Sequence, residues 1–306
     1  MNINSMNRTK LYGLNNKFNE LINLYQNNKF PNKIIFSGQK GVGKFTLSYH
    51  IINYILSIDE DYPYDLNTFS INEMNKSFKL MQNGTNPNFT LLDVSHDKKN
   101  IDINQIRELI NNLNKSSFNS KPRFILIDNI EYLNLNSINA LLKTLEEPSE
   151  NTFFILINNN KKISPTLLSR CINFKISLSK KESIEVCNNL FDENIYDLIN
   201  EDLLDYYFSP GKVYNLIEFS KKNEINLKLF NLKDFLTLLL NESYYKKNPL
   251  MKNMIYDFIE LFLVNKVSII YSDLFNYFLN KVRNIKKFNL DEESFFIEFK
   301  TKLLNE

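Results

Sequence analysis

The chain has 306 residues, of which 43% are hydrophobic, and a formal net charge of +2. This size suits one large or two to three smaller globular domains, and the small net charge excludes a strong overall attraction to nucleic acid or membranes. The two cysteines are too few for a disulfide framework or a four-cysteine zinc site.

Short apolar segments alternate with helical patterns over the first half of the chain. Segments with the length of buried strands occupy residues 34–36, 90–94, 124–127, 153–157 and 172–176. Helical spacing of apolar residues is found over 8–30, from a glycine-rich loop to about 56, and over 103–113, 138–145 and 165–169. Strands that alternate with helices predict a parallel sheet covered by helices on both faces.

The rest of the chain divides into a polar connection and a helical half. Residues 57–88 are interpreted as an insertion of polar residues with a short helix near 74–81. After residue 179 the strand patterns stop, and helices are expected over 180–192, 195–207, 210–222 and most of 227–306. We therefore expect three domains, at 1–177, 178–223 and 224–306.

A glycine-rich loop, GQKGVGKFT at residues 38–46, joins the first strand to a helix. This layout is typical of a P-loop, in which Gly38, Gly41 and Gly43 let backbone N–H groups surround phosphate oxygens. Lys44 would reach the β- and γ-phosphates. Three of the six glycines in the chain lie in this loop, which argues against a chance match. The loop is therefore a candidate nucleotide-binding site.

One position of this loop departs from the P-loop pattern. The residue after the lysine should be Ser or Thr, whose hydroxyl holds Mg²⁺, but it is Phe45, and a hydroxyl follows one position later on Thr46. One helical position turns a side chain by about 100°, so Thr46 is not expected to point toward the metal. Thr46 stays a candidate contact of a degenerate nucleotide site.

A second motif lies at the end of the third strand. The strand ends in Asp128, as in a Walker-B motif whose carboxylate supports Mg²⁺. The next residue, usually a Glu that polarises water in active ATPases, is Asn129, whose amide cannot accept a proton. Glu131 is expected to face elsewhere. An aspartate that only caps the following turn is the alternative.

Residues 139–148, NALLKTLEEP, and residues 169–171, SRC, together resemble bacterial clamp-loader subunits of the AAA+ class. The two motifs stand at the right separation after a P-loop and an Asp-ending strand. The resemblance is clear over 30–177 and weaker beyond. It implies an α/β AAA+ fold, with a five-stranded parallel sheet of the P-loop NTPase type, a small helical lid domain and an all-α C-terminal collar domain.

The resemblance also implies roles for two basic residues. Arg170 would be an arginine finger that reaches into the ATP site of a neighbouring motor subunit, since a guanidinium is always charged and engages phosphate oxygens through two N–H groups. Lys212 stands where the family carries its sensor-2 arginine, and it keeps the charge without the planar fork. The alternatives are a structural salt bridge for Arg170 and a solvent-exposed position for Lys212.

With the departures at Phe45 and Asn129, the resemblance implies a non-hydrolysing, stator-like subunit. Its implied partners in a pentamer-like hetero-oligomer are tau/gamma-type motor subunits, a delta-type subunit, the sliding clamp and primed DNA. A catalytically active P-loop ATPase, with Thr46 recruited to the metal, is the alternative.

Neither a metal nor another cofactor is required for the implied role, and the sequence leaves open whether ATP or ADP binds without hydrolysis. Many relatives carry a four-cysteine zinc module between the first helix and the second strand. The corresponding segment 57–88 has no cysteine, and His50 and His96 are solitary, so no zinc is expected. Polar first residues and the lack of an apolar run that could span a bilayer favour a cytoplasmic location.

Overall fold

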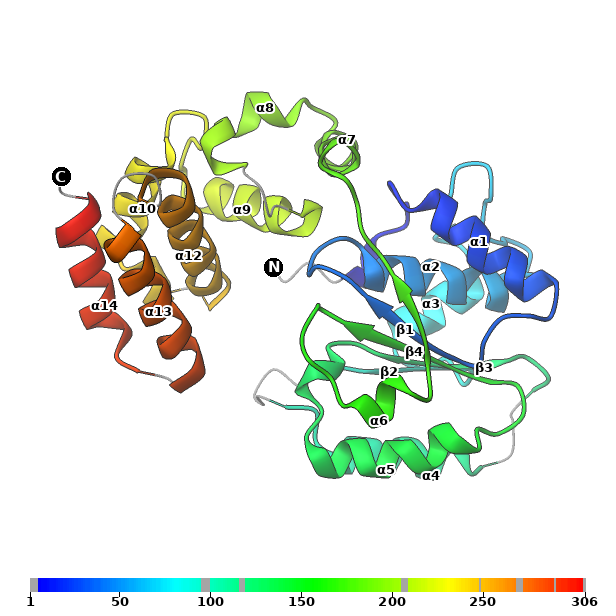
Figure 1. Cartoon of the computed structure of the whole chain (residues 1–306). Helices are drawn as coiled ribbons and strands as arrows, with labels where there is room; N and C mark the ends of the chain where they lie inside the picture. Colours follow the sequence, from blue (N-terminus) through cyan, green and yellow to red (C-terminus); the bar gives the residue numbers. More distant parts are fainter. Residues whose placement is uncertain are drawn as a thin grey trace. The chain divides into compact units, whose positions relative to one another are not determined.

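A computed structural model of the chain describes residues 5–94, 100–115, 119–204, 209–247, 249–267, 272–288 and 290–304. The chain folds into two units (Figure 1). The first comprises residues 1–186 with 209–211, and the second comprises 187–208 with 212–306. The division into three domains at 177 and 223 stays a prediction.

A five-stranded parallel sheet forms the centre of the first unit, as predicted (Figure 1). Its strands, in spatial order, are β2 (Phe89–Leu92), β3 (Arg123–Ile127), β4 (Thr152–Asn158), β1 (Lys33–Ser37) and β5 (Ile172–Lys175). Because all the strands run in the same direction, their carboxyl ends meet at one edge of the sheet and their amino ends at the opposite edge. We call these the carboxyl edge and the amino edge.

Helices cover both faces of the sheet (Figure 1). One face carries α1 (Asn15–Gln26), α2 (Lys44–Ser57) and α3 (Lys76–Gln82), and the other carries α4 (Ile103–Leu113), α5 (Leu135–Glu146) and α6 (Pro165–Leu168). Successive residues of a strand point to opposite faces of a sheet. Phe36 therefore packs into a core with α1–α3, whereas Ile35 packs into a second core with α4–α6.

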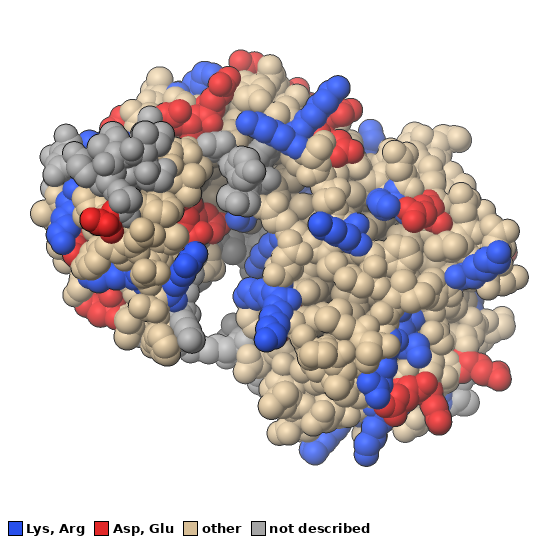
Figure 2. Space-filling model, viewed as in Figure 1, with Lys and Arg blue, Asp and Glu red and all other residues tan. Residues whose placement is uncertain are grey.

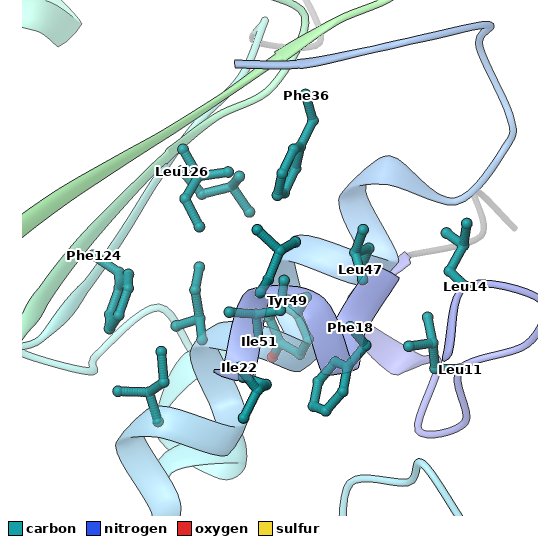
Figure 3. Close-up of a cluster of buried hydrophobic side chains, with 14 of the residues drawn as sticks. Leu11, Leu14, Phe18, Ile22, Phe36, Leu47, Tyr49, Ile51, Phe124 and Leu126 are labelled. Atoms are coloured by element: carbon teal, nitrogen blue, oxygen red, sulfur yellow. The ribbon is translucent and has the colours of Figure 1, made fainter. Parts of the chain in front are cut away.

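The core on the α1–α3 side is rich in aromatic and branched side chains. In Figure 3, Phe36, Phe124 and Leu126 of the sheet face side chains of the helices, among them Leu47 and Tyr49 of α2. All five are buried. Their burial fixes α2, and with it the loop that precedes α2, against the sheet.

The predicted helix over 8–30 is wrong in its first part, because α1 begins only at Asn15. The residues before it run alongside 69–71: the amide of Leu11 donates to the carbonyl of Phe69 at 3.0 Å, and the amide of Ile71 donates to the carbonyl of Thr9 at 2.7 Å. Gly13 (φ 71) then turns the chain in a left-handed conformation. Local apolar spacing cannot reveal this pairing, because the partner segment lies far along the chain.

The insertion at 57–88 is not only polar, which corrects the interpretation from sequence. The predicted short helix is present as α3. Tyr64, Ile71, Phe78 and Met81 belong to the same core as α1 and α2. These side chains are scattered among many polar residues, so composition hid their common burial.

The second unit is helical. Its elements are α8 (Ile195–Leu198), α9 (Pro210–Lys222), α10 (Leu232–Asn241), α11 (Tyr244–Lys247), α12 (Pro249–Phe262), α13 (Ser272–Phe288) and α14 (Glu292–Phe299), and α7 (Lys180–Phe191) leads into it from the first unit. Aromatic rings fill its core: the ring centroids of Phe278 and Phe299 are 5.4 Å apart, and those of Phe235 and Phe258 are 5.5 Å apart. The helices predicted over 180–192 and 210–222 are confirmed.

The helix predicted over 195–207 is broken. It ends at Leu198, and the Asn200 side chain accepts a hydrogen bond from the Asp202 amide at 3.0 Å, which starts a separate 3₁₀ turn. Residues 205–207 lie outside the described part of the chain.

Charged side chains of both signs lie among uncharged ones on the face drawn in Figure 2, as the small net charge leads one to expect. In the ranges that the structure describes, no helix is both long and apolar enough to cross a bilayer.

Candidate functional site

The glycine-rich loop lies at the carboxyl edge of the sheet, between β1 and α2. Gly41 (φ 90) and Gly43 (φ 95) adopt left-handed backbone conformations that other residues avoid. A Cβ atom on Gly38 would lie only 2.0 Å from the carbonyl oxygen of Ile176. The three glycines therefore meet the conformational and steric needs of a P-loop.

Lys44, the first residue of α2, folds back over this loop. Its Nζ donates to the carbonyl of Gly38 at 2.9 Å and to that of Gln39 at 2.8 Å, and the side chain is buried. Burial lowers the pKa of the ammonium to about 8, and the carboxylates of Asp128 and Glu131 oppose this shift. The lysine is thus held at the loop, where a positive charge would meet bound phosphate.

Phe45 packs against the core of the α1–α3 face. Its ring stacks on the ring of Tyr49, with centroids 6.1 Å apart and planes 16° apart. The side chain supplies packing and has no group that could bind a metal. Thr46 follows on the same turn and is half-buried, and its predicted contact with nucleotide stays a prediction.

Asp128 directly follows β3 at the carboxyl edge. Burial, together with the carboxylate of Asp93, which follows β2, raises the pKa of its carboxyl group to about 7. The amide of Asn129 donates to its Oδ1 at 2.8 Å and, like the charge of Lys44, opposes the shift. The charges of Lys44 and Asp128 thus act on each other's pKa, and both residues lie at the carboxyl edge.

Polar side chains that follow three adjacent strands form a hydrogen-bonded row at this edge. The Nδ2 of Asn129, after β3, donates to Oδ1 of Asp93 at 2.8 Å, and its Oδ1 accepts from Nδ2 of Asn159, after β4, at 2.8 Å. Asn159 also donates to Oε1 of Glu131 at 3.0 Å. The backbone of Asn129 is left-handed (φ 56), a conformation that asparagine tolerates better than most residues.

This row contains residues that the sequence analysis missed or misplaced. Glu131 was expected to face elsewhere, but it bonds Asn159 and its charge acts on Lys44. Asp93 falls inside the strand predicted over 90–94, but β2 ends at Leu92, and Asn159 is not among the predicted site residues. The available signal was a polar residue directly after each apolar strand, because the carboxyl ends of parallel strands meet at one edge.

Residues 209–211, which belong to the first unit, lie against the glycine-rich loop. The amide of Gly211 donates to the carbonyl of Gly41 at 2.9 Å, and the hydroxyl of Ser209 donates to the carbonyl of Lys40 at 2.7 Å. A Cβ atom at position 211 would lie 2.8 Å from Cα of Gly41, so a glycine is needed for this close approach. Residues 209–211 therefore belong to the loop's immediate surroundings.

Lys212 comes next in the chain, and its Nζ forms an ion pair with Oδ2 of Asp257 in α12 at 2.8 Å. Its predicted contact with phosphate stays a prediction.

In the described ranges, no group of three or more His, Cys, Asp or Glu side chains is arranged to hold a metal ion. His50 is buried and contacts the hydroxyl of Tyr64 and the carbonyl of Arg8, whereas His96 lies outside the described residues.

Arg170 lies at the amino edge, just before β5. Its Nε and Nη2 both donate to Oε1 of Glu146, at 3.0 and 2.6 Å, and its Nη1 donates to the carbonyl of Thr166 at 2.9 Å. The salt bridge considered from the sequence is thus present, and the arginine side chain is still 33% exposed.

Arg170 and the glycine-rich loop lie at opposite edges of the sheet. The strands β1 and β5 are parallel, and their four paired positions run from Ile34 and Ile172 to Ser37 and Lys175. Arg170 precedes the first pair and the loop follows the last, so roughly 13 Å of strand separates them along the sheet. Gly38, Gly41, Gly43, Lys44 and Asp128 are therefore brought together, and Arg170 is not among them.

Comparison with known sequences gives consistent matches. A family model described as "DNA polymerase III, delta subunit" matches residues 13–180. The chain is 30% identical over 288 residues to DNA polymerase III subunit delta′ of Buchnera aphidicola subsp. Schizaphis graminum. This alignment covers 88% of this chain and 84% of that protein. It is also similar to subunit delta′ of Pseudomonas aeruginosa, with 34% identity over 98 residues, or 32% of this chain and 30% of that protein.

Gamma-subunit relatives and solved structures match as well. DNA polymerase III subunit gamma of the same Buchnera is 34% identical over 141 residues, which spans 41% of this chain and only 37% of that protein. A DNA polymerase III gamma-subunit-related protein of Thermotoga maritima has a similar structure, with a TM-score of 0.53 and 15% identity over 93% of this chain and 98% of that chain. This last similarity concerns the fold alone.

Proposed function

This chain belongs to the DNA polymerase III delta′ family of AAA+ clamp-loader subunits, and from this premise we propose that it hydrolyses no ATP itself and supplies Arg170 as an arginine finger to a neighbouring motor subunit. In this proposal it is a stator-like subunit that helps to load the sliding clamp on primed DNA. Motor subunits of the gamma/tau type receive the finger, and a delta-type subunit completes the hetero-oligomer.

The observation that carries the proposal is the position of Arg170 at the amino edge, opposite the chain's own glycine-rich loop. Glu146 and Thr166 anchor its guanidinium at that edge. An arginine anchored there cannot serve a phosphate held by Lys44. We infer that the nucleotide engaged by Arg170 is bound by another subunit.

Two features of the candidate site support passive binding over hydrolysis. Phe45 stacks on Tyr49 and supplies no hydroxyl for Mg²⁺. Asn129 stands where a water-activating glutamate would, and its amide is engaged on both sides by Asp93 and Asn159. We infer that Lys44 and the glycines can hold ATP or ADP without turning it over, and that the role requires no zinc or other cofactor.

The test is ATP turnover by a clamp loader reconstituted from this chain and its motor and delta-type subunits. Arg170→Ala should lower the turnover stimulated by DNA and clamp by at least roughly tenfold, since arginine fingers contribute on the order of 10³–10⁵ in other phosphoryl-transfer systems. Arg170→Lys should restore little, because lysine lacks the planar fork. Arg107→Ala, on the exposed surface of α4, is the matched control.

Native mass measurement should confirm that each variant still assembles. Unchanged turnover in an intact complex that carries Arg170→Ala would sink the proposal. Steady hydrolysis by the isolated chain, lost in Lys44→Ala, would support an active ATPase instead.

A further inference from the structure

We propose that Glu146 is a positioning residue for Arg170, and that it holds the guanidinium in the orientation in which it meets the nucleotide of the neighbouring subunit. The inference rests on the proposed role of Arg170. It assigns a function to the last residue of α5, which lies 24 positions before the arginine in the chain.

The contacts fix all three nitrogens of the guanidinium. Nε and Nη2 are held by one oxygen of Glu146, and Nη1 is held by the carbonyl of Thr166. A guanidinium carries five N–H groups in one rigid plane. Its plane is therefore set, and Nη1 and Nη2 each keep one N–H group beyond these three contacts. Of these, Nη1 makes one further, long contact of 3.4 Å with the hydroxyl of Ser169.

Helix α5 gains little from an acidic residue at this position. Glu146 ends the helix, where the negative end of the helix dipole disfavours a carboxylate. The last turn has another partner, because Nζ of Lys33 donates to the carbonyl of Leu145 at 2.9 Å. The Glu146 side chain is 52% exposed, and exposed ion pairs contribute little to stability. Orientation of Arg170 explains the pair better than stabilisation of the fold does.

An exposed arginine that is not anchored samples many rotamers, and it must be immobilised when the transition state forms. Anchoring it beforehand places its positive charge where charge develops on the transferred phosphoryl group. The loss of Glu146 should therefore act on turnover more than on nucleotide binding.

The test uses the reconstituted clamp loader. Glu146→Ala should lower the turnover number on the order of tenfold and leave KM for ATP nearly unchanged. Glu146→Gln keeps an acceptor oxygen at the same reach and should recover part of the loss. Glu147→Ala changes the adjacent exposed glutamate and should leave turnover at the wild-type value.

A double-mutant cycle separates positioning from a general structural effect. When Arg170 is already Ala, the further change Glu146→Ala should cause no additional loss. An additive loss in the double variant overturns the inference. Unchanged or increased turnover with Glu146→Ala alone also overturns it, and an increase would mean that the pair restrains the arginine. If Arg170→Ala itself leaves turnover unchanged, the proposed function fails instead, so the two failures can be told apart.

Discussion

Two buried ionisable residues couple stability to pH in opposite directions. Burial raises the pKa of Asp128 from 3.8 to about 7, so the folded state keeps a proton that the unfolded state releases, and stability falls as pH rises through this range. Burial lowers the pKa of His50 from 6.5 to about 4, so the unfolded state takes up a proton first, and stability falls as pH drops from 6.5 to 4. In the wild-type chain the two effects offset each other.

Asp128→Asn should separate the two effects. It removes the cost of a buried carboxylate, so it should raise the free energy of unfolding at pH 8 by roughly 4 kcal/mol, the equivalent of the pKa shift, and this gain should vanish near pH 4. Between pH 6.5 and 4 the variant should lose stability more steeply than the wild type, because only His50 then acts. Urea unfolding at several pH values measures this. A gain that does not change with pH would contradict the assignment, and Asp61→Asn, an exposed aspartate, is the control.

At the scale of single residues, the sequence predicts functional residues that belong to a recognisable motif. It misses residues whose role depends on contacts that form only in the folded chain. Lys44 and Asp128 could be predicted, because each follows a recognisable strand at a fixed position. The pairing of Glu146 with Arg170 could not, since it requires the end of α5 to lie beside the residues that follow α6. Asn129 could be singled out from its position after Asp128, but its bonds to neighbouring strand ends needed the strand order.

At the scale of elements, the insertion at 57–88 is held by both packing and polar contacts. Phe78 and Met81 of α3 are buried against α1 and α2. Glu60 accepts a hydrogen bond from the Ser77 amide at 2.9 Å and pairs with Nζ of Lys121 at 3.3 Å. These packing and polar contacts between side chains hold the insertion against the rest of the first unit.

Met81→Ala should therefore destabilise the first unit by about 2–4 kcal/mol, because it leaves a cavity in a packed core. Met74→Ala removes the same atoms from a side chain that is 57% exposed, and it should cost less than about 0.5 kcal/mol. Denaturant unfolding with and without EDTA compares the two variants, and EDTA should change neither curve. Equal effects of the two substitutions would show that α3 does not pack as described.

The elements that could be predicted are those with strong local periodicity. Strands β1, β3 and β4 are built on continuous apolar runs, and the helix at 103–113 begins with a capping box between Asp102 and Gln105. The segment before α1 could not be predicted, because its apolar residues fit a helix while its backbone pairs with 69–71. Long-range pairing of this kind overrides local spacing.

At the scale of the whole molecule, the two candidate functional regions lie at opposite edges of the parallel sheet. The carboxyl edge holds the glycine-rich loop, Lys44 and Asp128, and the amino edge holds the pair of Arg170 and Glu146. In the proposed assembly, the first edge shapes the subunit and can hold nucleotide passively. The second edge serves the ATP site of a neighbour.

One comparison tests this account most directly: ATP turnover by reconstituted clamp loaders that carry either Lys44→Ala or Arg170→Ala in this chain. We predict that the Lys44→Ala complex, if it assembles normally, turns over ATP close to the wild-type rate. The Arg170→Ala complex should lose at least roughly nine-tenths of it, as expected for an arginine finger. Loss of turnover with Lys44→Ala and its retention with Arg170→Ala would contradict the account, because the chemistry would then take place in this chain's own loop.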